Sequence, residues 1–129
     1  MAQWQGRSRR KRTGGRYRPL RHKRKREIGR EAIPALVDTE GNEHASYRSR
    51  GGGIKIGQIK IATINVTDKA KGRTFPAKVK SVIENPSDPN YVQRNIVTKG
   101  ALVLTDKGKV KVTSRPGQNG ALNGILVAE

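Results

Sequence analysis

The side chains of this sequence best suited to chemistry are its cations, which concentrate at the N-terminus. Residues 1–30 contain thirteen of the 28 Lys and Arg residues and a single acid, Glu27. Ten of the thirteen are Arg, whose planar guanidinium matches phosphate oxygens and also stacks on bases. The segment also holds Trp4 and Tyr17, which could stack on unpaired bases of RNA. This density predicts a phosphate-binding segment whose cations are Arg7, Arg9, Arg10, Lys11, Arg12, Arg16, Arg18, Arg21, Lys23, Arg24, Lys25, Arg26 and Arg30.

Catalytic and metal-binding constellations do not assemble from the remaining polar residues. His22 lies within the arginine run and His44 in a polar stretch, and two isolated His in a chain without Cys make a poor metal site. Glu27 and Glu31 are spaced i, i+4, but the neighbouring arginines favour local ion pairing over a carboxylate pair. The chain has two Gly-rich stretches, Gly14-Gly15 and Gly51-Gly52-Gly53. Neither precedes the Lys-Ser or Lys-Thr pair of a phosphate-binding P-loop. We therefore expect neither an enzyme nor a cofactor nor a metal.

The overall charge restricts the class of partner. The 129-residue chain has a formal net charge of +18, which opposes compaction and calls for a polyanion. Nucleic acid is the commonest such partner, and an anionic membrane surface is the second. No apolar run approaches the roughly 18 residues of a membrane span, and the basic segment has no amphipathic apolar face. Charge therefore favours nucleic acid, and the sequence predicts no membrane contact and no small-molecule substrate.

The chain divides into two regions of different composition. Residues 1–30 contain few large apolar side chains and are interrupted by Gly14-Gly15 and Pro19, so they predict an extended basic arm that is disordered when free. A short helix over roughly residues 22–29 is compatible with this pattern. We assign residues 1–44 to the arm and a linker and residues 45–129 to one folded domain. The sequence leaves open whether residues 31–44 form a strand or a linker.

Alternation of apolar and polar residues predicts strands after residue 45. Ile54-Lys55-Ile56 and Ile59-Lys60-Ile61 place apolar and basic residues on opposite faces, with a change of phase near Gly57 or Ala62 that indicates a bulge or bend. Phe75, Ala77 and Val79 predict a second strand, with Lys78 and Lys80 facing outward.

The C-terminal third of the chain adds a hairpin and a closing strand. Residues 101–105 and 109–113 flank Asp106-Lys107-Gly108, a hairpin signal, and residues 122–127 form an apolar strand. Asp88 and Pro89 suit the start of a short helix over residues 88–94. The pattern predicts a mainly β fold, a small antiparallel β-barrel-like domain or sandwich with a small aliphatic core and at most one or two short helices.

Several motifs, in order along the chain, resemble one protein family. They are the runs over residues 4–8 (WQGRS), 13–16 (TGGR), 21–31 (RHKRKREIGRE), 48–52 (RSRGG), 83–101 and 112–118 (VTSRPGQ). They resemble the archaeal and eukaryotic-type small-subunit ribosomal protein eight, which is unrelated to the bacterial protein of that number. The resemblance spans almost the whole chain, which looks like the compact archaeal form.

The resemblance implies a β-barrel-like domain with a long N-terminal extension, placed in the cytoplasmic ribosome. Both parts would lie against 16S ribosomal RNA in the 30S subunit, beside neighbouring small-subunit proteins. The arm would thread between RNA helices and neutralise their phosphates. Cations near the loops of the domain would extend this contact, namely Arg48, Arg50, Arg94, Lys99 and Arg115.

Two hypotheses for the function come from different classes. The first is a structural constituent of the small subunit that stabilises folded ribosomal RNA by phosphate neutralisation and shape recognition. The alternative is a free RNA-binding module or RNA chaperone on the same barrel. Such a module would need stacking aromatics on its strands, where the sequence offers only Phe75 and Tyr47.

Overall fold

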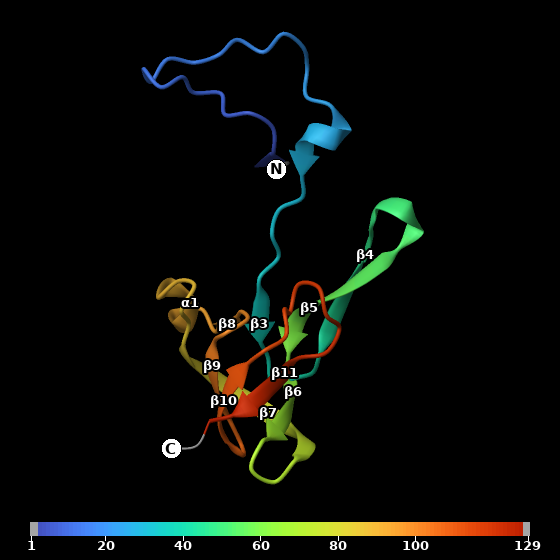
Figure 1. Cartoon of the computed structure of the whole chain (residues 1–129), viewed down its shortest axis with the longest axis vertical. Coiled ribbons are helices and arrows are strands. Elements are labelled where there is room, and N and C mark those ends of the chain that lie inside the picture. The colour runs from blue at the N-terminus through green and yellow to red at the C-terminus, as the bar shows by residue number, and fades with distance from the viewer. Residues whose placement is uncertain (1–2, 128–129) are drawn as a thin grey trace. The chain divides into compact units, whose positions relative to one another are not determined.

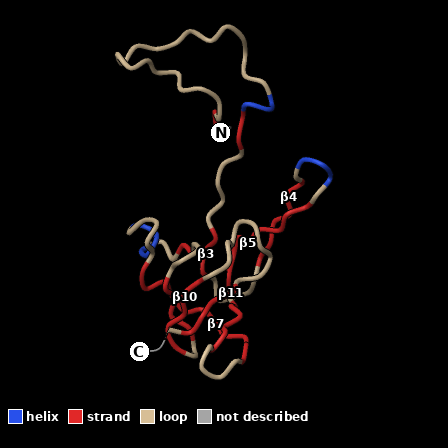
Figure 2. The backbone as a smooth tube through the Cα atoms, in the orientation of Figure 1, coloured by secondary structure: helices blue, strands red, loops and turns tan. Residues whose placement is uncertain are grey.

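The computed structural model describes residues 3–127, which form two units. The first unit ends at Ala32 and the second begins at Ile33. Figure 1 shows the strands of the second unit gathered around a barrel, whereas the first unit is mostly loop (Figure 2). The division into an arm and linker over residues 1–44 and a domain over residues 45–129 stays a prediction. Residues 35–37 pair with strands of the second unit.

Five strands close the barrel of the second unit. They are β6 (Thr63–Asp68), β7 (Arg73–Glu84), β9 (Leu102–Thr105), β10 (Gly108–Val112) and β11 (Asn123–Leu126). They follow one another in the order β10-β11-β6-β7-β9, and pairing of β9 with β10 closes the ring. The mainly β, barrel-like fold is confirmed. Four of the five strand pairs are antiparallel as predicted, but β6 and β11 run parallel.

The parallel pair has a simple cause that alternation cannot reveal. A closed ring of five strands cannot alternate in direction all the way round, so at least one of its pairs must be parallel. β10 and β11 are antiparallel neighbours joined by residues 113–122, and the parallel pair falls between β11 and β6. Asn65 N donates to Leu122 O over 2.9 Å, which sets β11 beside β6 in the same direction. A period of two residues indicates which face is buried but not the direction of the neighbouring strand.

The core of the barrel is small and aliphatic, as the composition predicts. Inward positions on successive strands are almost fully buried, and they are Ile64, Val66, Ala77, Val79, Val82, Val103, Val110 and Val112. On β7, Lys78 and Lys80 are exposed, so the predicted alternation there is confirmed.

A four-stranded sheet continues the second unit. Its strands are β3 (Ala35–Val37), β4 (Glu43–Arg48), β5 (Ile54–Ile61) and β8 (Ile96–Val97), in the order β4-β5-β3-β8. β3 runs parallel to β5, which resolves the open question of residues 31–44 in favour of a short strand followed by a turn. Ala35 and Val97 join the buried core cluster, so this sheet and the barrel share one hydrophobic core.

The first half of β5 differs from the sequence prediction. Ile54 and Ile56 are 72% and 48% exposed, because β4 and β5 extend beyond the barrel as a two-stranded hairpin (Figure 1). The extra residue in β5 is Ile59, since Glu43 pairs with Lys60 while His44 pairs with Gln58. The predicted bulge therefore lies two residues after Gly57, and the predicted bend is at Ala62, between β5 and β6.

The turns and the short helix of the second unit follow the predicted chemistry. β9 and β10 form the expected hairpin, and Gly108 has a φ of +122°, which glycine tolerates best. The short helix α1 (Asn90–Gln93) follows Pro89, and Asp88 Oδ1 accepts a hydrogen bond from Asn90 N over 2.9 Å. A short helix is present where predicted, but it starts one residue later, because Pro89 and not Asp88 is the N-cap, and α1 is only one turn long.

The first unit is a long loop closed by two short strands. β1 (Gln3–Trp4) pairs with β2 (Ile28–Gly29), and a three-residue 3-10 turn, η1 (Lys25–Glu27), replaces the longer helix expected over residues 22–29. Trp4 lies opposite Ile28, so residues 5–27 fold back on themselves. The structure does not confirm the extended arm, disordered when free, that the sequence predicted.

Candidate nucleic-acid interface

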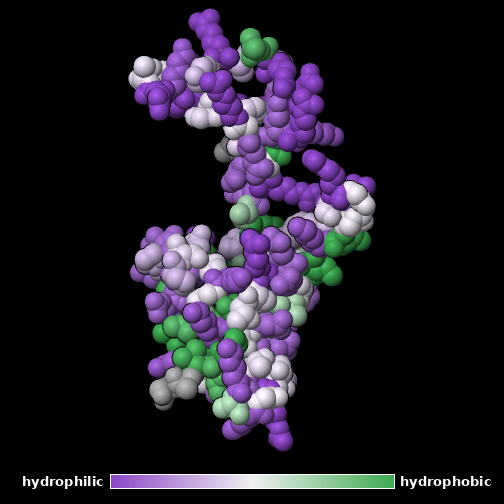
Figure 3. All heavy atoms as spheres, viewed as in Figure 1, coloured by the Kyte–Doolittle hydropathy of each residue, from purple (hydrophilic) through white to green (hydrophobic). Residues whose placement is uncertain are grey.

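The eighteen cations predicted to bind RNA share one property, which is that all of them are exposed. Thirteen lie in the first unit and five in the second. In Figure 3 the visible face of the first unit is dominated by hydrophilic side chains. Exposed guanidinium and ammonium groups can exchange water for phosphate without unfolding any part of the chain.

Main-chain hydrogen bonds bring the cations of the first unit together. Arg10 and Arg16 form an isolated antiparallel bridge, and Lys11 N donates to Gly15 O over 2.8 Å. Tyr17 N donates to Arg9 O over 2.8 Å and continues this pairing. The run from residue 9 to residue 17 is therefore a narrow hairpin-like loop that presents its cations outward.

Trp4 organises the base of this loop. Its indole Nε1 donates to Arg7 O over 2.7 Å, and the Arg9 guanidinium lies over the indole, 5.1 Å from the ring centroid. The ring is half-buried, although most of the loop around it is exposed. One of the two predicted stacking residues is therefore held in place by the chain itself.

Tyr17 already interacts with two cations of its own loop. Arg7 lies over the ring at 4.5 Å from its centroid and Lys11 at 5.4 Å. Arg7 Nη2 also donates to the Tyr17 hydroxyl over 3.0 Å. These cation–π contacts hold the cationic groups of Arg7 and Lys11 over the ring.

Glu27, the single acid between residues 1 and 30, is bound by Arg21. Arg21 donates to both carboxylate oxygens of Glu27, over 2.6 and 3.1 Å, and Arg24 N donates to the same group over 3.3 Å. The Arg21 hydrogen bond is the main cause that lowers the pKa of Glu27. The predicted ion pairing is confirmed, but the partner lies six residues earlier, not among the adjacent arginines.

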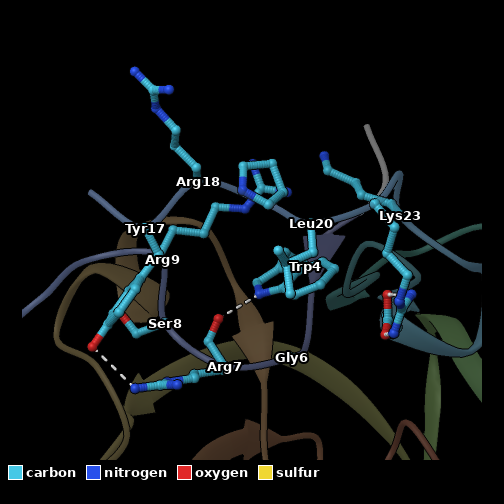
Figure 4. Close-up of a pocket in the computed structure, with 12 residues that line it drawn as sticks. Trp4, Gly6, Arg7, Ser8, Arg9, Tyr17, Arg18, Leu20 and Lys23 are labelled. Atoms are coloured by element: carbon cyan, nitrogen blue, oxygen red, sulfur yellow. Dashed lines mark hydrogen bonds and ion pairs between the residues drawn. The ribbon is translucent and has the colours of Figure 1, made fainter.

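A pocket of about 460 Å³ opens between the start and the end of the loop (Figure 4). Its lining comes from the first unit, from most of residues 4–9, from residues 17–21, and from Lys23 and Glu27. Trp4, Arg7, Arg9 and Leu20 are among the residues that line it. An aromatic ring, aliphatic side chains and several guanidinium groups therefore meet in one cavity.

In the second unit, Arg48 and Arg50 lie at the tip of the β4–β5 hairpin. Ser49 N and Ser49 Oγ both donate to Gly53 O, over 2.7 and 2.9 Å, and close the turn η2 (Arg50–Gly52). Gly51 and Gly52 have φ values of +82° and +83°, which bulkier residues rarely adopt. The tight turn leaves the two arginines exposed at the end of a projecting hairpin.

The other three predicted cations of the second unit lie at loops. Arg94 follows α1, and its backbone N–H donates to Asn90 O over 3.4 Å. Lys99 follows β8, and Arg115 begins a turn whose Gln118 and Asn119 N–H groups donate to its carbonyl over 3.0 Å. Among residues 3–127, no described hydrogen bond or ion pair joins these three side chains to one another.

Comparison with known proteins gives the family. The sequence model described as Ribosomal protein S8e matches residues 4–127. The relative from Methanocorpusculum labreanum, named "Small ribosomal subunit protein eS8", is 43% identical over 124 residues, which cover 96% of this chain and 98% of the relative. Proteins of the same name from Haloarcula marismortui and Methanoregula boonei are 45% and 46% identical and cover 95% and 97% of this chain, respectively, and 97% and 98% of their own.

The chain belongs to the ribosomal protein S8e family.

Membership of the S8e family confirms the resemblance found in the sequence motifs. The match begins at Trp4 and ends at Val127, so it includes both units. The curated relatives are archaeal, in line with the compact form expected from the sequence. Proteins of this family are structural rather than enzymatic, as the sequence predicted.

The two His residues do not join a metal-binding group. Between residues 3 and 127, no three side chains among His, Cys, Asp and Glu come close enough to hold a metal ion. The helices of the described chain include none long and apolar enough to cross a membrane.

Sequence reasoning missed the apolar side of the pocket in the first unit. Leu20 is fully exposed yet lines the cavity, and Gly6 lies against the Trp4 ring. One signal was present in the sequence, since Trp4 and Ile28 are large apolar residues at the two ends of an otherwise polar segment. Their cross-strand contact is what closes the loop.

Proposed function

We propose that this protein is a structural constituent of the small ribosomal subunit and stabilises 16S ribosomal RNA. The observation that supports the proposal best is the exposure of all thirteen cations of residues 1–30, against one acid that Arg21 already occupies. The chain belongs to a family whose relatives are named small ribosomal subunit proteins, which supports a location in the cytoplasmic ribosome.

Neutralisation of phosphate is the central step of the proposed mechanism. RNA helices packed side by side repel one another through their backbones, and cations between them relieve this repulsion. Arginine binds phosphate oxygens with two parallel donors, so it also fixes the direction of approach. The loop of the first unit would supply this contact between RNA helices.

The second unit would recognise the shape of folded RNA. Arg48 and Arg50 project on a hairpin, while Arg94, Lys99 and Arg115 lie at loops, so contact points are spread over separate loops. Dispersed contacts with the RNA backbone depend on the shape of the folded RNA and depend little on its base sequence. Neighbouring small-subunit proteins would cover part of the remaining surface.

The alternative, a free module for single strands, has less support. Such modules stack successive bases on aromatic side chains of the barrel surface. Phe75 is instead half-buried against the barrel core, and Tyr47 packs over the backbone at Gly57. Neither side chain offers an open platform to consecutive bases.

Sedimentation of ribosomes from the source cells tests the proposed function. The tagged full chain, a version beginning at residue 33, and a full-length variant with Arg9, Arg10, Arg12 and Arg16 changed to Gln would be followed in low and high salt. We expect the full chain to travel with the small subunit and to resist a high-salt wash. Both altered proteins should be lost in high salt, because each removed cation takes away a phosphate contact and leaves a weaker complex.

Two outcomes would contradict the proposal in different ways. If the full chain stays at the top of the gradient, it is not a ribosomal constituent, and the free RNA-binding module becomes the better hypothesis. If all three proteins sediment with the small subunit and resist the wash equally, the first unit does not anchor the protein.

A further inference from the structure

The pocket of the first unit combines the two surfaces that a nucleotide presents. One wall is aromatic and aliphatic, formed by Trp4 and Leu20, and the rim carries the guanidinium groups of Arg7 and Arg9 (Figure 4). We propose that this pocket binds one unpaired nucleotide of RNA, with its base against Trp4 and its phosphate on the rim arginines. The proposal rests on the RNA-binding function above and assigns one specific contact within it.

The aromatic wall is fixed before any ligand arrives. The Trp4 backbone pairs with Ile28, and its indole N–H is bound to Arg7 O, so both ends of the residue are held. A Cβ atom on Gly6 would lie 2.5 Å from Cζ2 of the indole, so a larger residue at position 6 would displace the ring. A ring that is already ordered loses little conformational entropy when a base stacks on it.

The aliphatic wall of the pocket leaves apolar side-chain surface in contact with water. Leu20 is fully exposed, and it follows Pro19, which lines the same pocket. A flat base inserted beside Trp4 would remove apolar surface of Leu20 from water, which favours binding in proportion to the area covered. The pocket volume of about 460 Å³ falls within the roughly 300–1,000 Å³ common for small-ligand sites.

The rim arginines are positioned to bind a phosphate. Arg7 is oriented by the Tyr17 ring and hydroxyl, and Arg9 by the Trp4 ring. The acid that lines the pocket, Glu27, is already paired with Arg21. Tyr17 therefore has a different role from Trp4, since it positions Arg7 and Lys11 instead of stacking on a base.

The nucleotide must be unpaired, because the stacked bases of an RNA duplex expose no face to a protein. A bulged or looped-out nucleotide presents both faces of its base and leaves its phosphate accessible. Stacking on Trp4 should accept any of the four bases, because every base presents a π-face.

Trp4 is the single Trp of the chain, so its fluorescence reports on the pocket alone. The full-length protein would be titrated with a 14-base-pair RNA duplex and with the same duplex carrying one bulged adenosine. We expect the bulged duplex to quench Trp4 fluorescence with a stoichiometry of one, and the paired duplex to leave it nearly unchanged. Affinity, measured in parallel by anisotropy of labelled RNA, should favour the bulged duplex by about fivefold or more.

Two substitutions of equal charge separate the pocket from general electrostatics. Arg9→Gln removes a rim guanidinium, whereas Arg12→Gln removes an exposed cation outside the pocket lining. Arg12→Gln should weaken both duplexes equally and keep the fivefold preference. Arg9→Gln should lower the preference toward one. Trp4→Phe, which keeps an aromatic ring, should retain more of the preference than Trp4→Leu.

The outcomes of this experiment are distinguishable. Equal affinity for both duplexes with no difference in quenching overturns the pocket while leaving the RNA-binding function intact. A preference that survives Arg9→Gln and Trp4→Leu also overturns it, because the bulge is then bound elsewhere. Failure to bind either duplex at low salt counts against the proposed function and the pocket together.

Discussion

At the scale of the residue, Gly124 shows how little room the barrel leaves. A Cβ atom there would collide with Val110 Cγ1 and lie 3.0 Å from both Ile64 Cδ1 and Lys111 O. These atoms come from neighbouring strands, and Lys111 O belongs to the backbone of β10, so it cannot move without disturbing strand pairing. The glycine permits close packing of β11 against β10 and β6, and this small core depends on such close packing.

We predict that Gly124→Ala destabilises the protein by about 1–3 kcal/mol, the usual effect of overpacking a core. Urea unfolding of the full-length chain, followed by circular dichroism, measures the free energy of unfolding. Gly117→Ala is the matched control, because a Cβ atom there meets nothing within 4 Å and should change stability little. Equal midpoints for the two variants would show that the barrel can expand around β11.

At the scale of the element, the β4–β5 hairpin carries exposed charge beyond the barrel (Figure 1). Arg48 and Arg50 lie at its tip, where Ile54 also remains exposed. The hairpin between β6 and β7 carries a comparable exposed pair, Lys69 and Lys71, on the barrel itself. The two hairpins therefore allow comparison of equal charges in different places.

We predict that changing Arg48 and Arg50 to Ala weakens binding to small-subunit ribosomal RNA. It should reduce the slope of log affinity against log salt by about two, because each cation accounts for roughly one released counterion. Changing Lys69 and Lys71 to Ala should alter the slope less, since the sequence does not place that pair at the RNA. Filter binding at four salt concentrations measures the slopes, and identical slopes for the two variants would refute the assignment.

The elements also show where sequence reasoning succeeds. Strands such as β7 and the β9–β10 hairpin were predicted correctly, because alternation and turn chemistry are local properties of the chain. The parallel β6–β11 pair was not predicted, because strand direction depends on contacts 58 residues apart, such as the one between Asn65 and Asn123. The exposure of Ile54 was missed because alternation assumes that every apolar face meets a core.

The same distinction applies to the candidate site. Residue types predicted the thirteen phosphate-binding cations of residues 1–30, and the family resemblance added five in the second unit. All eighteen are exposed, and their binding of phosphate stays a prediction. Their partners within the chain could not be predicted, because the contact of Arg9 with Trp4 depends on closure of the loop by β1 and β2. The pocket is thus a tertiary property of a segment whose composition favours disorder.

At the scale of the whole molecule, hydrophobic stabilisation and charge are concentrated in different units. Every buried core residue lies between Ala35 and Leu122, and none of residues 3–32 is buried. Residues 33–129 carry fifteen Lys and Arg against eight Asp and Glu, a formal charge of +7, whereas the full chain carries +18. The first unit therefore adds much of the self-repulsion of the molecule and no buried core residue.

We predict from this separation that residues 33–129 fold on their own. Their thermal unfolding should be cooperative, with a Tm within about 5 °C of the full chain at moderate salt, equivalent to roughly 1 kcal/mol for a domain of this size. At low salt the Tm of the full chain should fall more than that of the shorter one, because unscreened repulsion grows with net charge. Circular dichroism of both proteins over a range of salt concentrations measures this difference. A non-cooperative transition, or a Tm more than about 10 °C lower for residues 33–129, would mean that the first unit contributes to the stability of the barrel.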